Sequence, residues 1–86
     1  MLTYHLEPSS GTPLYEQLYR AVRRDIMDGT LAGGTRLPSK RQLAANLRIS
    51  QITVETAYGQ LAAEGYIVSA PRRGYFVQEQ IAPPPA

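Results

Sequence analysis

Apolar residues recur every three or four positions in residues 13–28, which predicts an amphipathic helix. Thr12 is placed to cap this helix, with Pro13 at its first helical position. Gly29 is placed to close it, and Tyr19 is expected to flank the apolar stripe at the edge of the core. The stripe itself consists of Leu14, Leu18, Ala21, Val22 and Ile26.

A second helix is predicted after Pro38, and its start carries a side-chain signal. Ser39 is followed three residues later by Gln42, which is a capping box: the serine hydroxyl accepts from the Gln42 amide, and the glutamine reaches back to Ser39. Pro38 disfavours a helical conformation at Leu37, so the helix begins after it. Its apolar residues are Leu43, Ala44 and Leu47.

A third helix is predicted after a short break at Arg48-Ile49 and spans about residues 51–64. Ser50 is its N-cap, and Gly65 ends it at the position where a left-handed cap favours glycine. The apolar face is Val54, Ala57, Tyr58 and Leu61. Two short helices joined by a tight turn are typical of a helix-turn-helix, which places its second helix in the DNA major groove. The sequence leaves open whether Gly59, inside this helix, allows close packing.

The outward face of the third helix begins with small and polar residues. Glutamine can pair bidentately with adenine, and threonine can serve a base edge or a phosphate. An ordinary solvated face on a helical bundle would show the same residue types, so both readings remain open at this point. The residues are Gln51, Ile52, Thr53, Glu55 and Thr56.

After Gly65 the pattern changes to residues that favour strands. Residues 66–70 and 75–78 are rich in β-formers, and residues 71–74 lie between them as a hairpin loop. Arg36-Leu37 can add a short third strand. The predicted fold is therefore α+β, a winged helix-turn-helix with three helices and a C-terminal two-stranded wing. Two arginines at the tip of the wing suit the minor groove or flanking phosphates.

Positive charge is gathered around the predicted helix-turn-helix, as a phosphate-facing surface requires. Six basic and two acidic residues lie between Arg36 and Arg73, whereas the rest of the chain has three basic and five acidic residues. The three basic residues of the first helix are interpreted as a solvated face, because acidic residues lie four positions away. They are Arg20, Arg23 and Arg24.

The composition excludes several classes of site. Without cysteine there is no disulfide or thiolate metal site, and the single histidine, His5, cannot build a histidine cluster. No secretion signal is present and no apolar run approaches the ~18 residues of a membrane span, so we expect no membrane partner and a cytoplasmic location. A small enzyme would need a nucleophile–base pair or a carboxylate pair, and the sequence offers neither. A winged helix used for protein contacts would expose an apolar recognition face, whereas the face predicted here carries Gln51, Thr53, Glu55 and Thr56.

The 86 residues divide into three expected segments. Residues 1–12 are an N-terminal arm, residues 13–78 form the winged helix-turn-helix domain, and residues 79–86 are a proline-rich linker. Pro83-Pro84-Pro85 cannot join a core and reads as a stiff, extended spacer. We therefore expect the linker to lead to a C-terminal domain absent from this chain.

The chain resembles the DNA-binding domain of GntR-type bacterial transcription regulators, because many characteristic residues occur in the same order. The resemblance covers residues 13–77, and its opening and its Ala57-Tyr58 to Tyr66 run look most like the MocR subfamily. Members of that subfamily join this domain to one resembling fold-type I aminotransferases, which binds pyridoxal phosphate. The matching pieces are residues 13–18, Gly34, residues 36–39, Arg41, Leu43-Ala44, Ser50, Thr53-Val54, Ala57-Tyr58, Leu61, residues 64–66 and residues 74–77.

The resemblance implies roles for individual residues. Arg41 matches an arginine that contacts the DNA backbone and nearby base edges, Ser50 and Thr53 match residues that hold phosphate, and Gly74 matches the second glycine of the wing. Three residues depart from the common pattern: Gln51 and Glu55 stand where basic residues are frequent, and Arg72 stands where glycine is frequent. The full predicted DNA-binding set is Arg36, Ser39, Lys40, Arg41, Ser50, Gln51, Ile52, Thr53, Glu55, Thr56, Arg72, Arg73 and Gly74.

The expected partner is double-stranded operator DNA. No cofactor is expected on this chain, because the resemblance places pyridoxal phosphate only on the absent aminotransferase-like domain. The same domain is expected to supply dimerisation, so the isolated chain should be monomeric.

Overall fold

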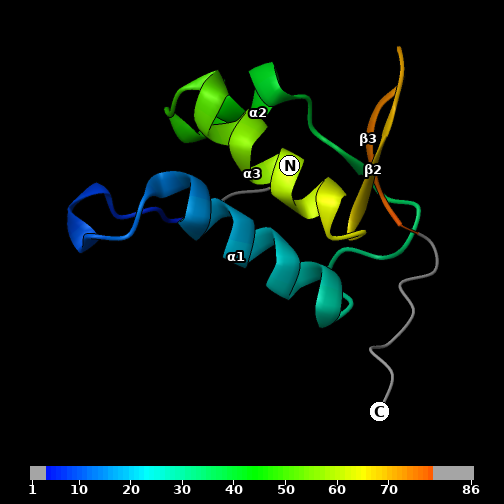
Figure 1. The fold of residues 1–86 in the computed structure, drawn as a ribbon, viewed down its shortest axis with the longest axis horizontal. Helices are drawn as coiled ribbons and strands as arrows, with labels where there is room; N and C mark the ends of the chain where they lie inside the picture. The colour runs from blue at the N-terminus through cyan, green and yellow to red at the C-terminus, as the bar shows by residue number, and fades with distance from the viewer. Residues whose placement is uncertain (1–3, 79–86) are drawn as a thin grey trace.

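Three helices and a three-stranded sheet surround an apolar core in the computed structural model, which describes residues 4–78 (Figure 1). Helix α3 lies between α1 and α2, and the strands pack at one end of the helices. The predicted winged helix-turn-helix, including its third strand, is confirmed. In chain order the elements are the 3-10 turn η1 (Pro8–Ser10), α1 (Leu14–Met27), β1 (Arg36–Leu37), α2 (Lys40–Leu47), α3 (Gln51–Ala63), β2 (Ile67–Ala70) and β3 (Gly74–Val77).

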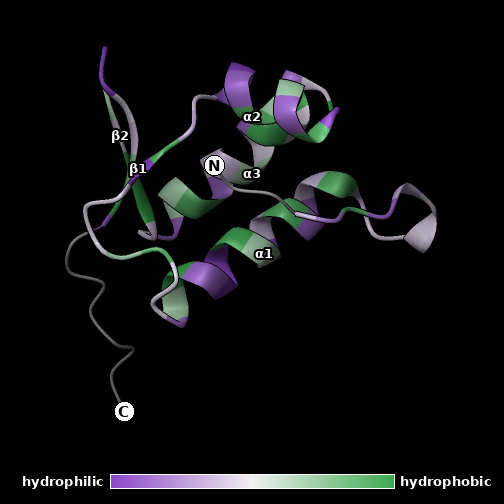
Figure 2. Cartoon of the chain, turned by 180° about the vertical axis from the view of Figure 1, so that it is seen from behind, coloured by the Kyte–Doolittle hydropathy of each residue, from purple (hydrophilic) through white to green (hydrophobic). Residues whose placement is uncertain are grey.

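Helix α1 has the predicted amphipathic character, which Figure 2 shows as alternating green and purple bands. The predicted cap is wrong: Pro13, not Thr12, is the N-cap residue, and it has no side-chain donor or acceptor to offer. Tyr19 was expected at the edge of the core but is only 5% exposed, because its hydroxyl donates to Glu64 beyond the end of α3. The partner that allows burial lies 45 residues away in the chain.

The side chain of Gln17 holds the segment before α1 in place. Its Oε1 accepts from the Glu7 amide at 2.7 Å, and its Nε2 donates to the Glu7 carbonyl at 2.8 Å and the Thr12 carbonyl at 2.7 Å. Farther upstream, the Tyr4 hydroxyl donates to Asp25 at 2.7 Å. Residues 4–12 are therefore tied to α1 at both ends.

The two predicted caps of the helix-turn-helix are confirmed. Ser39 Oγ accepts from the Gln42 amide at 3.1 Å, and Gln42 Oε1 accepts from the Ser39 amide at 3.2 Å. Ser50 Oγ accepts from the Thr53 amide at 3.0 Å. Between the helices, Arg48 takes the left-handed conformation with φ 58°, which turns the chain from α2 into α3.

Strand β3 is central in the antiparallel sheet and joins the wing to the helix-turn-helix. It pairs with β2 along its whole length and with β1 through Leu37 opposite Tyr75. Since β1 leads directly into α2, this pairing fixes the wing relative to α2. No helix among residues 4–78 has the length and apolar character that crossing a membrane would require.

Candidate nucleic-acid interface

Helix α3 has two faces with different roles. Its buried face is the predicted one, with Val54, Ala57, Tyr58 and Leu61 each 0% exposed. The opposite face is open to solvent. Its residues share one side of the helix, because positions three and four apart are neighbours there. That outer face consists of Gln51, Ile52, Glu55, Thr56 and Gly59, all exposed.

Gly59 belongs to this outer face and not to a helix contact. A Cβ added there would meet no atom within 4 Å. Close helix packing therefore does not explain the glycine. The exposure of Gly59 could have been predicted from the sequence, because it lies four residues after Glu55 and three after Thr56 and so shares their face of the helix.

The hydroxyl groups near the start of α3 are engaged within the helix itself. Ser50 Oγ and Thr53 Oγ1 lie 2.7 Å apart, in addition to the cap bond to the Thr53 amide. Thr56 Oγ1 donates to the Ile52 carbonyl at 2.8 Å. Among the α3 residues predicted to contact DNA, Gln51, Ile52 and Glu55 form no such bond within the helix in the described structure.

The start of α2 joins the outer face of α3 in one surface. Lys40 Nζ lies 3.8 Å from Glu55 Oε2, so two predicted DNA-facing residues from different helices form an ion pair. Ser39 and Arg41 are exposed on either side of Lys40. Arg48, which the sequence analysis did not single out, is exposed at the turn between the two helices.

The tip of the wing presents two exposed arginines on a tight turn. The turn is closed by the Arg73 amide, which donates to the Ala70 carbonyl at 2.9 Å. Arg72 has φ 64°, a left-handed conformation that is unfavourable for a residue with a Cβ. The next glycine, Gly74, has φ 108°, and a Cβ there would lie 3.7 Å from Arg36 Nε, an ordinary contact. Backbone conformation, not crowding, therefore favours glycine at position 74.

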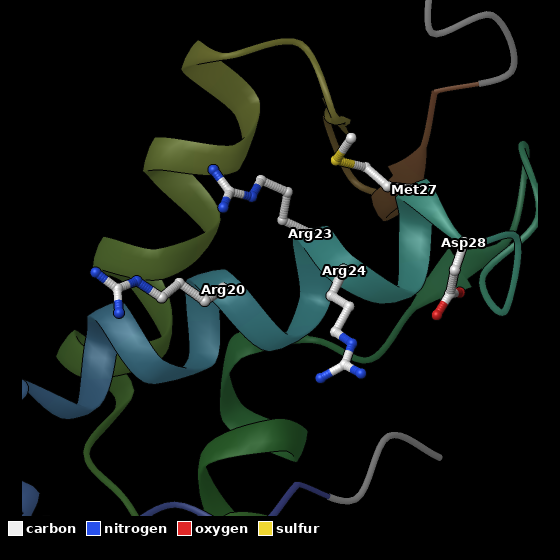
Figure 3. A pocket seen from close by; sticks show the side chains of 5 residues that line it. All are labelled: Arg20, Arg23, Arg24, Met27 and Asp28. Atoms are coloured by element: carbon white, nitrogen blue, oxygen red, sulfur yellow. The ribbon is translucent and has the colours of Figure 1, made fainter.

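The three arginines of α1 line a shallow hollow of about 600 Å³ (Figure 3), and this hollow includes no residue of α2, α3 or the wing. Arg20 pairs with Glu16 at 3.6 Å, and the Arg23 guanidinium lies over the Tyr19 ring at 5.1 Å and donates to its hydroxyl. Figure 3 shows Arg24 pointing away from the other two, so the guanidinium groups do not converge on one ligand position. This arrangement agrees with the predicted solvated face.

Asp28, at the rim of that hollow, caps the turn after α1. Its carboxylate accepts from the Thr30 amide at 2.9 Å. The hydrogen bonds from Thr30 lower the pKa of Asp28, and the charge of Arg24 lowers it to a smaller extent. Within residues 4–78 no group of three or more His, Cys, Asp or Glu side chains is arranged to hold a metal ion.

The family described as bacterial regulatory proteins, gntR family, matches residues 14–77. The chain is 55% identical over 75 residues to the uncharacterized HTH-type transcriptional regulator YdeL of Bacillus subtilis, covering 87% of this chain and 16% of that protein. It is 40% identical over 72 residues to the probable rhizopine catabolism regulatory protein MocR of Rhizobium meliloti, covering 84% of this chain and 15% of that protein. The chain thus spans about one sixth of the length of these two relatives.

Solved structures share the fold over nearly the whole chain. YtrA from Sulfolobus acidocaldarius, a GntR-family transcription factor, superposes with a TM-score of 0.82 at 36% identity, covering 90% of this chain and 81% of that one. The DNA-binding domain of AraR in complex with operator ORX1 superposes with a TM-score of 0.74 at 27% identity, covering 87% and 99%. In the AraR structure, a domain with this fold is bound to operator DNA.

Proposed function

The chain belongs to the GntR family of bacterial regulatory proteins, and we propose from this premise that it reads one half of an operator with α3 in the major groove. It is the DNA-binding domain of a transcription regulator. The wing lies at the minor groove beside the recognised bases. A single recognition helix per chain accounts for one half-site.

The observation that carries this proposal is the 3.8 Å pair between Lys40 and Glu55. It brings the cationic start of α2 to the outer face of the recognition helix, so that phosphate-contacting and base-contacting groups share one surface. Arg41 contacts phosphates, and Gln51 pairs with an adenine edge. Arg72 and Arg73 contact the minor groove or its flanking phosphates. Of the remaining members of the predicted set, Arg36 lies on β1 beside Gly74 of the wing, and the others lie on α2 and α3 or at their caps.

The finer assignment is to the MocR type of regulator. The identity to MocR and the small share of that protein's length that the chain covers support a longer protein. The resemblance to the MocR subfamily implies that its second domain dimerises and binds pyridoxal phosphate. This chain alone then binds DNA weakly, as a monomer. A dimer that binds two half-sites at once gains affinity, because the first DNA-binding domain raises the effective concentration of its partner at the second half-site.

A salt titration tests DNA binding. With roughly four to six phosphates neutralised, the logarithm of the binding constant falls with the logarithm of salt concentration at a slope of about −4 to −5. Arg41→Ala reduces the slope by about one and weakens binding to all duplexes. Arg24→Ala, which removes an exposed arginine from α1, leaves both unchanged. Binding that is flat across the titration would reject the proposal and favour a protein-contact role.

The oligomeric state and the response to pyridoxal phosphate test the MocR assignment. Sedimentation of the isolated chain should show a monomer, and fusion to an unrelated dimeric protein should tighten binding to a paired site about a hundredfold or more. Added pyridoxal phosphate should give no aldimine absorbance band with this chain. A stable dimer or such a band would contradict the assignment.

A further inference from the structure

Ile52 is a large apolar side chain on the surface where the structure otherwise collects polar and charged groups. It is 73% exposed and lies in the first turn of α3. In the described part of the chain, the other exposed large hydrophobic residues are Met27 at 67% on α1 and Val68 at 42% on β2. Burial in the core therefore does not account for isoleucine at this position.

Thr56 adds a second apolar group one turn farther along the same face. Its hydroxyl donates to the Ile52 carbonyl at 2.8 Å, which directs its polar atom to the backbone of its own helix. The hydroxyl hydrogen is thereby used within the helix, and the apolar group that Thr56 can offer a ligand is its methyl. Because residues four apart are neighbours on a helix, Ile52 and Thr56 form a small apolar patch within the outer face of α3.

We infer that this patch contacts the 5-methyl group of a thymine in the major groove. Among the atoms that base pairs present there, the thymine methyl is the apolar one, and apolar groups such as the threonine methyl or a phenylalanine ring pack on it. The inference rests on the proposed function, since it requires α3 to lie in the major groove. It deepens that function by naming the base that Ile52 recognises.

The neighbouring residue fits the same base pair type. Gln51 is exposed beside Ile52, and glutamine is suited to the N6 and N7 positions of adenine. Adenine recognition by Gln51 and thymine recognition by Ile52 both favour A·T pairs under the first turn of α3. The charged member of the face, Glu55, is held by Lys40 and lies one turn beyond Gln51.

The test begins with selection of a preferred half-site from random duplexes by the wild-type chain. Each thymine of that half-site is then replaced in turn by deoxyuridine, which removes the 5-methyl group and keeps the pairing. We expect one replacement at the contacted position to weaken wild-type binding ~3- to 10-fold, the scale of losing one buried methyl group. Ile52→Ala should lose most of this difference between the thymine and deoxyuridine sites.

Two further variants separate the methyl of Thr56 from its hydroxyl. Thr56→Val keeps a methyl and should retain the preference for thymine over deoxyuridine, whereas Thr56→Ser removes the methyl and should reduce it. Val68→Ala, at an exposed apolar residue of β2, should retain the full preference. Since Ile52 is exposed, its variant should unfold at the wild-type temperature.

The outcomes distinguish this inference from the function on which it rests. If a half-site is selected but no deoxyuridine replacement weakens binding, the thymine contact is refuted and DNA recognition stands. If Ile52→Ala keeps the wild-type preference for thymine, Ile52 is not the reader. Failure to select any half-site would refute the proposed function itself.

Discussion

The hydroxyl of Tyr58 donates to the carbonyl oxygen of Pro38 at 2.8 Å and so joins the recognition helix to the residue just before the cap of α2. The same ring lies against Tyr75 of β3, with ring centroids 4.7 Å apart at an angle of 59°. Tyr58 is fully buried and contacts all three parts of the interface: α3, the start of α2 and the wing. The relative placement of the DNA-facing groups therefore depends on a residue that DNA does not touch.

Removal of this hydroxyl should destabilise the domain. Tyr58→Phe keeps the ring contact with Tyr75 but leaves the Pro38 carbonyl without its partner, at a cost of about 1–2 kcal/mol. Urea unfolding followed by circular dichroism measures the loss. Tyr15→Phe is the control, because the described structure shows no hydrogen bond from that hydroxyl, and it should change stability little. Equal effects of the two variants would contradict the role of the Pro38 bond.

The domain should lose stability at alkaline pH. Burial raises the pKa of the Tyr58 phenol above its ordinary value of 10.0, and the nearby Tyr75 phenol raises it further. The folded protein therefore keeps this proton at a pH where the unfolded chain loses it. The stabilisation is complete below about pH 10 and falls above it, by up to about 1.4 kcal/mol per pH unit.

Burial also raises the pKa of Tyr4 and Tyr19, so the wild-type decline above pH 10 should exceed that of one tyrosine. Unfolding free energies measured at about pH 9 and pH 11 give this decline. Tyr58→Phe should lose less than the wild type over the same interval. An identical decline in both proteins would show that Tyr58 does not titrate differently in the folded state.

Replacement of Gly59 and of Gly65 by alanine should have opposite effects on stability. Gly59→Ala should stabilise the domain by about 1 kcal/mol, because alanine favours a helix and a Cβ there meets no neighbour. Gly65→Ala should instead cost about 1–2 kcal/mol, since its φ is +86° although its surroundings are equally open. Thermal unfolding of both variants measures the difference. A stabilising Gly65→Ala would invalidate the argument from backbone conformation.

The wing should show a separation of stability from DNA affinity. Arg72→Gly relieves a left-handed residue and should leave stability unchanged or raise it by up to about 1 kcal/mol. It also removes a charge, so DNA affinity should fall and the protected footprint should shorten at its flank. Arg73→Gly removes the same charge without relieving a positive φ and should lower stability. An unchanged footprint in both variants would place the arginines in solvent.

The features that the sequence predicted correctly are those fixed by neighbours in the chain. The caps at Ser39 and Ser50 are made with amides three residues away, and the buried face of α3 follows from helical spacing. The contacts that the sequence did not predict join distant partners. Tyr19 is buried because of Glu64, and Lys40 meets Glu55 across two helices, neither of which a local pattern encodes.

The segment before α1 is a second case in which the local sequence pattern was not sufficient. Pro13 and Thr12 suggested a conventional cap, but the Gln17 side chain takes over the backbone groups of the preceding loop. A glutamine in the first turn of a helix is common, so its side-chain partners cannot be read from its position. The assignments of individual DNA contacts remain predictions, since they depend on a partner outside the chain.

The two faces of α3 bear on how such a domain can diverge. Buried core residues and exposed outer-face residues, which we propose meet the major groove, occupy separate positions of this thirteen-residue helix. A change at Gln51, Ile52 or Glu55 therefore alters what is recognised at almost no cost in folding. Gene duplication followed by single substitutions on that face can supply regulators with new operators, each starting from an intact scaffold. The same separation makes the outer face a natural place to randomise when a new DNA specificity is sought.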